Sequence, residues 1–235
     1  MATKLANGVY AVDLCIYLPD IKAIVISDLH LGYEESLGRQ GVLVPRTQFK
    51  QIIKRLEWIT SNVGVERVVL NGDVKHEFGR VSQQEWREVL RLLEYFEKKK
   101  IKVIVIKGNH DTILGPIARK KQVKEFKEIR HKDILIAHGD YIPKKLAPIV
   151  IIGHEHPALT LREKAKQEKY KCFLKGNYKK SKLIVQPSFN PLVEGTDVSK
   201  EEILSPLITD ISKLEVYIVD DRTHDVLSFG KLKSL

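Results

Sequence analysis

The chain has 235 residues, of which 43% are apolar and 30% are charged, and this balance excludes a disordered chain. No apolar run reaches the ~20 residues that a membrane-spanning helix needs, and the first residues show no apolar stretch followed by a small-residue cleavage site. We therefore expect no membrane partner and a cytoplasmic location. The net charge of +10 suits a polyanionic partner, although ordinary solubility explains it equally well.

The first half of the chain alternates apolar runs with segments of helical periodicity. Apolar spacing predicts one helix over 46–62 and a second that starts after Ser82, a plausible N-cap, and closes at lysines 98–100. The stretch 32–45 is expected to be a loop with one helical turn. Residues 9–18 are predicted to form a leading strand or a hairpin, and the other predicted strands of this half are 22–27, 67–70, 101–106, 133–137 and 148–152.

The second half lacks long helical segments. Its short predicted strands are 158–161, 170–174, 183–185, 215–219 and 226–228. We expect them to form a second, more antiparallel sheet packed on the first, which gives an α/β protein with two sheets. The sequence contains no evident repeat or linker, so residues 1–235 are predicted to form one domain.

Polar side chains follow five of the predicted strands. Asp28 and His30 follow the first core strand, and if the chain stays extended there, both point the same way. Glycine precedes several of the other polar residues and allows the backbone to turn sharply. The candidate metal ligands are Asp28, His30, Asp73, Asn109, His138, His154 and His156.

This donor set predicts a particular kind of metal centre. A structural zinc site is closed, four-coordinate and usually rich in cysteine, whereas Cys15 and Cys172 stand alone. Seven oxygen and nitrogen donors suit two divalent ions that share a bridging carboxylate. Mn²⁺ is the first choice, with Fe, Zn²⁺ and Ni²⁺ as alternatives.

Two ions about 4 Å apart form a clamp for in-line attack of a bridging hydroxide at phosphorus. The leaving alkoxide then needs a proton. His110 lies beside Asn109 and is followed by Asp111, so we expect it to act as general acid with its imidazolium steadied by that carboxylate.

At these residues the chain resembles the calcineurin-like metallophosphoesterases. Five motifs match in order between residues 24 and 157: Asp28-x-His30, Gly72-Asp73, Gly108-Asn109-His110-Asp111, His138 and Gly153-His154-x-His156. The segments 72–78 and 187–192 are similar to those of archaeal phosphoesterases related to the Mre11/SbcD nucleases and of bacterial DNA-ligase-associated phosphoesterases.

The resemblance implies a four-layer αββα sandwich with a dinuclear site. By the family pattern one ion is held by Asp28, His30 and His156, the other by Asn109, His138 and His154, and Asp73 bridges them. His110 is the catalytic histidine of that pattern. Many members carry a carboxylate three residues after the bridging aspartate, where this chain has His76.

Three further residues are candidate substrate contacts. His76 is as well explained by a supporting role behind the ligands. Ser188 and Asn190 lie in Pro-Ser-Phe-Asn-Pro, a composition that also favours a simple turn.

The segment Arg162–Lys182 is rich in lysine and arginine, with Tyr170, Phe173 and Tyr178 between them. Such a segment can bind single-stranded nucleic acid through charge and stacking. A charged surface hairpin explains the same composition and is the commoner cause.

The sequence thus favours an enzyme that hydrolyses phosphodiesters of nucleotides or nucleic acids. A phosphomonoesterase is the alternative enzyme. A non-catalytic scaffold that retains the fold is the third hypothesis, although a retired site usually loses its catalytic histidine, which is present here.

Overall fold

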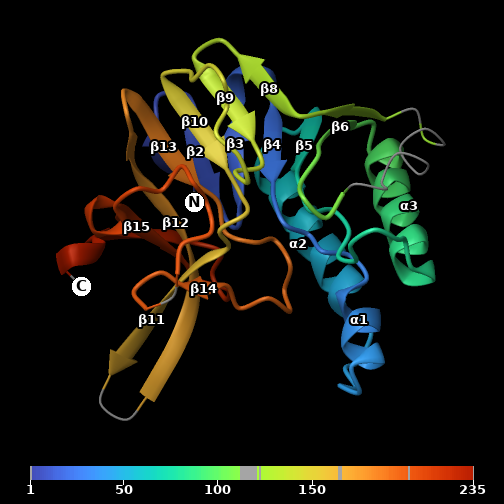
Figure 1. The fold of residues 1–235 in the computed structure, drawn as a ribbon. Helices are drawn as coiled ribbons and strands as arrows, with labels where there is room; N and C mark the ends of the chain where they lie inside the picture. Colours follow the sequence, from blue (N-terminus) through green and yellow to red (C-terminus); the bar gives the residue numbers. More distant parts are fainter. Residues whose placement is uncertain (1, 112–120, 122, 164–165, 201, 235) are drawn as a thin grey trace.

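The computed structural model describes residues 2–111, 121, 123–163, 166–200 and 202–234. Two β-sheets lie face to face, and the main helices lie beside the first sheet (Figure 1). This arrangement confirms the predicted α/β sandwich of two sheets.

The first sheet is mixed, because its strands change direction relative to one another at its centre. From β1 to β4 each strand runs antiparallel to its neighbour, and from β4 to β7 the strands run parallel. In order across the sheet the strands are β1 (Thr3–Ala6), β2 (Val9–Val12), β3 (Cys15–Leu18), β4 (Ala23–Ile26), β5 (Arg67–Asn71), β6 (Lys102–Ile106) and β7 (Lys124–Phe126).

The second sheet is also mixed. Strands β9, β10 and β13 are parallel, and the other strands that follow β10 pair antiparallel except the short β14. The strands, in sheet order, are β14 (Thr196–Asp197), β11 (Pro157–Glu163), β12 (Lys166–Tyr178), β13 (Ser181–Val185), β10 (Ile149–Ile152), β9 (Ile134–Ala137) and β8 (Glu128–His131), with β15 (Glu215–Val219) and β16 (Val226–Lys231) added beside β12.

Three α-helices are formed by the described residues: α1 (Tyr33–Arg39), α2 (Gln48–Asn62) and α3 (Gln83–Lys98). The predicted cap of α3 is confirmed, because the Ser82 side chain accepts from Glu85 N and the Glu85 carboxylate accepts from Ser82 N. The expected single helical turn after Gly32 is a seven-residue helix.

Alternation along the central strands builds two cores. Ile149 and Ile151 of β10 face the space between the sheets, whereas Val150 and Ile152 face away from it. The outward side chains are covered by the irregular segments 198–200 and 202–214, the latter with the 3₁₀ turn η2 (Ile211–Lys213), and by the 3₁₀ turn η3 (Leu232–Ser234). In the described residues this irregular layer stands where the αββα description has outer helices. A further 3₁₀ turn, η1 (Pro19–Ile21), joins β3 to β4.

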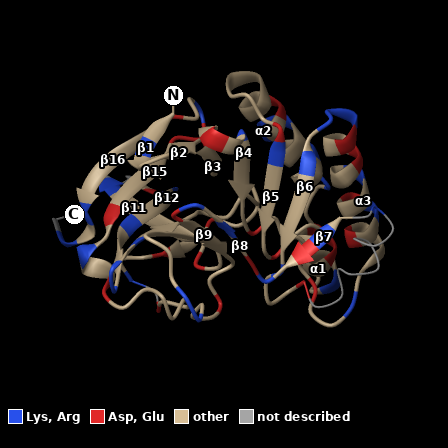
Figure 2. Ribbon diagram, turned by 90° about the horizontal axis from the view of Figure 1, so that it is seen from above, with Lys and Arg blue, Asp and Glu red and all other residues tan. Residues whose placement is uncertain are grey.

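The basic segment Arg162–Lys182 forms most of the long β11–β12 hairpin, with residues 164 and 165 outside the described part. Phe173 is fully buried and Tyr178 nearly so, which removes two of its three aromatic rings from solvent. Lysine and arginine are spread over both halves of the ribbon, with acidic residues among them on the helices (Figure 2). Within the described ranges, each helix is too short or too polar to cross a membrane.

Candidate metal centre

The predicted ligands lie just beyond the carboxyl ends of five strands. Strands β4, β5 and β6 are parallel neighbours in one sheet, and β9 and β10 are parallel neighbours in the other. Because parallel strands end at the same edge, each sheet brings its polar side chains to one place. The two edges meet, and a single cluster forms from residues as far apart in the chain as Asp28 and His156.

The backbone at this cluster is strained. Five of the seven predicted ligands have positive φ angles, a conformation that side chains other than glycine seldom adopt: Asp28, His30, Asp73, His154 and His156. Such strain persists only where the surroundings enforce it, and it is concentrated at functional sites. The expectation that Asp28 and His30 converge through an extended chain is therefore wrong, since β4 ends at Ile26 and left-handed turns aim both side chains.

One group of ligands joins Asp28, His30 and His156. A donor atom of each lies within 4.8 Å of the other two. Asp28 Oδ1 is 3.1 Å from His156 Nε2, and His30 Nε2 is 3.4 Å from the same nitrogen. Asp28 and His30 are buried, whereas the His156 side chain is 19% exposed, so the group opens to solvent at His156.

A second group joins Asp73, His138 and His154 within the same limit. His138 Nε2 lies 3.1 Å from the Asn109 side-chain oxygen, which brings the predicted amide ligand to this group. His138 Nδ1 lies 3.1 Å from the Asn71 carbonyl oxygen, and this contact fixes the ring so that Nε2 faces the cluster.

Asp73 lies between the two groups. Its Oδ2 is 3.4 Å from His138 Nε2 and 3.8 Å from His30 Nε2, one histidine of each group. Two donors bound at about 2.1 Å to one ion are about 3.0–3.4 Å apart, so the shorter contacts of both groups fit metal coordination. The donor set therefore fits two divalent ions, with Asp73 at the shared position.

The protonation states of the side chains in the cluster favour the binding of cations. Burial, together with the neighbouring His156, lowers the pKa of His30 to about 3, although Asp28 and Asp73 oppose this change. Burial disfavours the ionised form of Asp73, but contacts with His138, His30 and His110 outweigh it and lower the pKa of that carboxyl. At neutral pH the cluster thus offers a neutral imidazole and a carboxylate, the forms that bind metal.

The pKa of His138 shows how the carboxylates of Asp73 and Asp28 stabilise a positive charge beside them. Burial favours its neutral form, yet Asp73 and Asp28 raise the pKa of His138 to about 10. A cation in this position satisfies the same two carboxylates.

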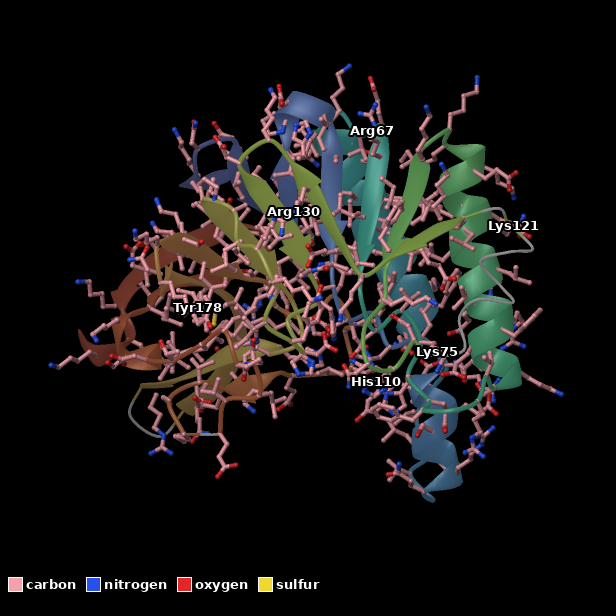
Figure 3. The ribbon with its side chains drawn as sticks, turned by 45° about the horizontal axis from the view of Figure 1, so that its top comes forward. Arg67, Lys75, His110, Lys121, Arg130 and Tyr178 are labelled. Atoms are coloured by element: carbon pink, nitrogen blue, oxygen red, sulfur yellow. The ribbon has the colours of Figure 1, made fainter. Side chains whose placement is uncertain are left out.

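His110 lies at the edge of the cluster. Its Nε2 is 3.8 Å from Asp73 Oδ2, while its Nδ1 hydrogen-bonds to the His76 carbonyl oxygen. His110 and the buried Lys75 lie near each other beyond the strands of the first sheet (Figure 3). His76 packs edge-on to His30, and one ring nitrogen of each of His30, His76 and His110 lies within 4.8 Å of the other two.

Asp111 has a different setting from the one expected. Its carboxylate accepts hydrogen bonds from the backbone amides of Val74, Lys75 and Gly108, at 3.0–3.3 Å. These amides belong to the loops that carry Asp73 and Asn109. Asp111 therefore joins the two ligand loops, and the imidazole of His110 is oriented by the carbonyl of His76 instead.

Ser188 and Asn190 are buried and bonded within the protein. Ser188 Oγ donates to the Asp28 carbonyl oxygen at 2.8 Å, and the Asn190 side-chain oxygen accepts from Leu192 N at 2.9 Å. Lys171 Nζ, from the β11–β12 hairpin, donates to the carbonyls of both Ser188 and Asn190. This geometry favours the turn interpretation, with the turn bracing the chain at Asp28.

Two positioning groups were missed by sequence reasoning. Glu85 does more than cap α3, because its carboxylate also accepts from His76 N and Glu77 N, at 3.0 and 2.6 Å. Lys171 was counted only as part of a basic segment. A glutamate three residues after a serine is a visible capping signal, whereas nothing local in the sequence marks Lys171 as a brace.

Comparisons with known proteins agree with this geometry. The sequence matches the calcineurin-like phosphoesterase family over residues 21–219. No curated protein matches the sequence significantly.

Among solved structures, the nuclease MPE of Pseudomonas putida has a TM-score of 0.70 at 19% identity, covering 97% of this chain and 99% of that one. The phosphoesterase Yfce of E. coli has a TM-score of 0.42 at 14% identity, covering 87% of this chain and 95% of that one. The identities are low, so the first of these similarities shows the fold alone. From the family match over most of its length, this chain belongs to the calcineurin-like phosphoesterases, hydrolases that act on phosphoester bonds.

Proposed function

We propose that the protein is a phosphodiesterase that depends on two divalent metal ions and acts on nucleotides or nucleic acids. The observation that carries this proposal is the position of Asp73 Oδ2, 3.4 Å from His138 Nε2 and 3.8 Å from His30 Nε2. One carboxylate oxygen between two groups of donors suits a pair of ions better than a single one.

The residues divide the work as follows. Asp28, His30 and His156 would hold one ion, Asn109, His138 and His154 the other, and Asp73 both. When bound, the ions supply Lewis-acid activation of water and neutralise charge on the phosphoryl oxygens. The donor set includes carboxylate, amide and imidazole, which suits Mn²⁺ first and Fe, Zn²⁺ or Ni²⁺ as alternatives.

His110 is the proposed general acid. Its Nδ1 donates to a carbonyl, so its Nε2 is free to carry a proton toward the leaving oxygen. The similarity to a nuclease of known structure and the net charge of +10 support a diester of nucleic-acid type.

The test begins with protein stripped by chelator and then supplied with Mn²⁺. We expect hydrolysis only after Mn²⁺ is restored, and a faster rate on bis-p-nitrophenyl phosphate than on p-nitrophenyl phosphate. The Asp73→Asn variant should lose both hydrolysis and part of the bound metal, while Asp133→Asn, at an exposed position, should keep both.

Faster hydrolysis of the monoester would replace the proposal with a phosphomonoesterase. A folded protein that binds metal and hydrolyses neither compound with any divalent ion would favour the scaffold hypothesis.

A further inference from the structure

One large apolar side chain beside the candidate metal centre is left in solvent. Phe78 is 59% exposed, although apolar rings of this size are usually buried. Its ring covers the imidazole of His110, with centroids 3.6 Å apart and planes inclined by 35°. One face of the phenyl ring is thus occupied by His110, and the exposure of the side chain leaves apolar surface for another group.

The position of this ring is fixed by the backbone that precedes it. Glu85 accepts from the amides of His76 and Glu77, and His76 N also donates to the Leu31 carbonyl at 3.1 Å. Asp111 holds the amides of the two residues before His76. A side chain held by such a framework needs little ordering when a ligand binds.

Other rings extend the same aromatic surface. His76 stacks on His110, with centroids 5.7 Å apart, and Tyr33 packs edge-on to His76 at 4.7 Å. Both side chains are half-buried. His110 Nε2, the atom proposed to carry a proton toward the leaving oxygen, lies 3.8 Å from Asp73 Oδ2.

We propose that Phe78, supported by His76 and Tyr33, is a stacking site for a nucleobase, and that the substrate is therefore a diester of a nucleotide. This inference rests on the proposed phosphodiesterase function. A nucleobase is joined through one sugar to its phosphate, and so brings a flat apolar face close to the phosphorus that is attacked. Every base has such a face, so an aromatic platform binds nucleotides with little preference for sequence.

The charged side chains at the rim are paired with one another. Glu77, between His76 and Phe78, is paired with Arg39 at 3.3 Å and with Arg80 at 3.0 Å. Arg39 also pairs with Glu35 at 2.6 Å, so two guanidinium groups face two carboxylates and the charges beside the exposed ring are balanced. Two of the three aromatic rings of the basic hairpin, Phe173 and Tyr178, are buried in the cores, which leaves Tyr170 as its partly exposed ring.

The experiment compares two diesters with one leaving group: thymidine 5′-(p-nitrophenyl phosphate) and methyl p-nitrophenyl phosphate. They differ in the nucleoside, and both release p-nitrophenol. The ratio of their kcat/KM values is measured for the Mn²⁺-loaded wild type and for Phe78→Leu and Phe78→Tyr. Phe126→Leu is the matched control, since Phe126 is also exposed and lies on β7.

We expect the wild type and Phe126→Leu to prefer the nucleoside diester. Phe78→Leu should reduce that preference roughly 10-fold, within the range that base–aromatic stacking supplies, and Phe78→Tyr should restore it. The rate on the methyl diester should fall by a smaller factor, because that compound carries no base to stack on the ring. An equal fall on both diesters would overturn the inference and assign Phe78 to the support of His110 alone.

A binding measurement separates this inference from the proposed function. If the wild type hydrolyses neither diester, the phosphodiesterase proposal fails, and calorimetry with thymidine 5′-monophosphate and methyl phosphate decides the question. The stacking site would be supported if the wild type bound thymidine 5′-monophosphate more tightly than methyl phosphate and if Phe78→Leu abolished that difference. Equal binding of both compounds by the wild type would overturn it.

Discussion

Nδ1 of the His110 imidazole donates a hydrogen bond to the backbone carbonyl oxygen of His76. A carbonyl oxygen only accepts, so Nδ1 must carry a proton in both charge states of the ring. The Nε2 atom alone gains and loses a proton, and it faces Asp73 at 3.8 Å. The fold thus selects which nitrogen of His110 can serve as the proposed acid, and it does so through the backbone of the residue three positions after Asp73.

Replacement of His110 by alanine should slow turnover about 10²–10⁴-fold, which is the usual contribution of general acid–base catalysis. The described ligands of the two triads remain, so we expect the metal content to be unchanged. Both are measured on one preparation, by diester hydrolysis and by elemental analysis. The control is His131→Ala on β8, where the ring contacts Asp20 at 3.0 Å. Full activity in His110→Ala would refute the assignment.

Replacement of Gly72 by alanine should destroy metal binding. Gly72 has φ of +82°, and a Cβ atom there would lie 2.1 Å from His138 Nδ1. The ring of His138 must move, which withdraws a predicted ligand. The matched control is Gly41→Ala, since Gly41 has φ of +85° with nothing within 4 Å.

Both alanine variants carry the same backbone strain, so the contact with His138 is the difference between them. Calorimetric titration with Mn²⁺ measures the outcome. Equal metal affinity in the two variants would show that His138 tolerates the displacement or is not a ligand.

Replacement of Asp111 by asparagine should lower the free energy of unfolding by about 1–3 kcal/mol, the cost of leaving buried hydrogen-bonding groups unpaired. The new amide nitrogen would face backbone N–H groups that now donate to the carboxylate. Chemical denaturation measures this change, with Asp133→Asn as the exposed control. If Asp111 instead acted on the protonation of His110, stability would hold while the pH profile of kcat shifted.

We expect the stability of the folded protein to depend on pH through the ammonium group of Lys171. Burial, aided by the positive charge of Arg55, lowers the pKa of Lys171 to about 7, against the attraction of Asp221, Asp13 and Asp28. In the unfolded chain a lysine titrates near 10.4. Between these values the unfolded state binds more protons than the folded state, so the contribution of Lys171 to stability rises with pH.

We therefore expect Lys171→Met to lose stability relative to the wild type as the pH is raised from 7 to 9. Urea denaturation at both pH values measures the difference. Lys50→Met, at an exposed position on α2, should differ from the wild type by the same amount at both. A difference for Lys171→Met that does not change with pH would contradict the assigned titration.

Much of the fold was readable from local pattern. Alternating and helical apolar spacing located most strands and the two long helices to within a few residues, because burial of one face selects the period directly. Four strands were missed, since they are short and largely polar or partly exposed: Thr3–Ala6, Lys124–Phe126, Glu128–His131 and Thr196–Asp197. The family resemblance predicted the layer on the outer face of the second sheet only in part, because irregular chain covers that face here instead of helices.

The candidate ligands were readable for a chemical reason. Metal ions require particular donor atoms, and the sequence places those donors after apolar runs that end at one sheet edge. The order and spacing of Asp28, His30, Asp73 and Asn109 were therefore enough to predict the candidate metal centre without knowledge of the turns between them.

Tertiary structure decided the rest, because it depends on contacts between distant segments. Left-handed turns, not an extended strand, aim Asp28 and His30. Asp111 binds three backbone amides across two loops, and Phe173 turns into the core while Phe78 stays in solvent. The sequence by itself determined which donors exist and where the strands end; only the packed sheets decided which atoms meet, since a side chain's partners are set by the whole fold.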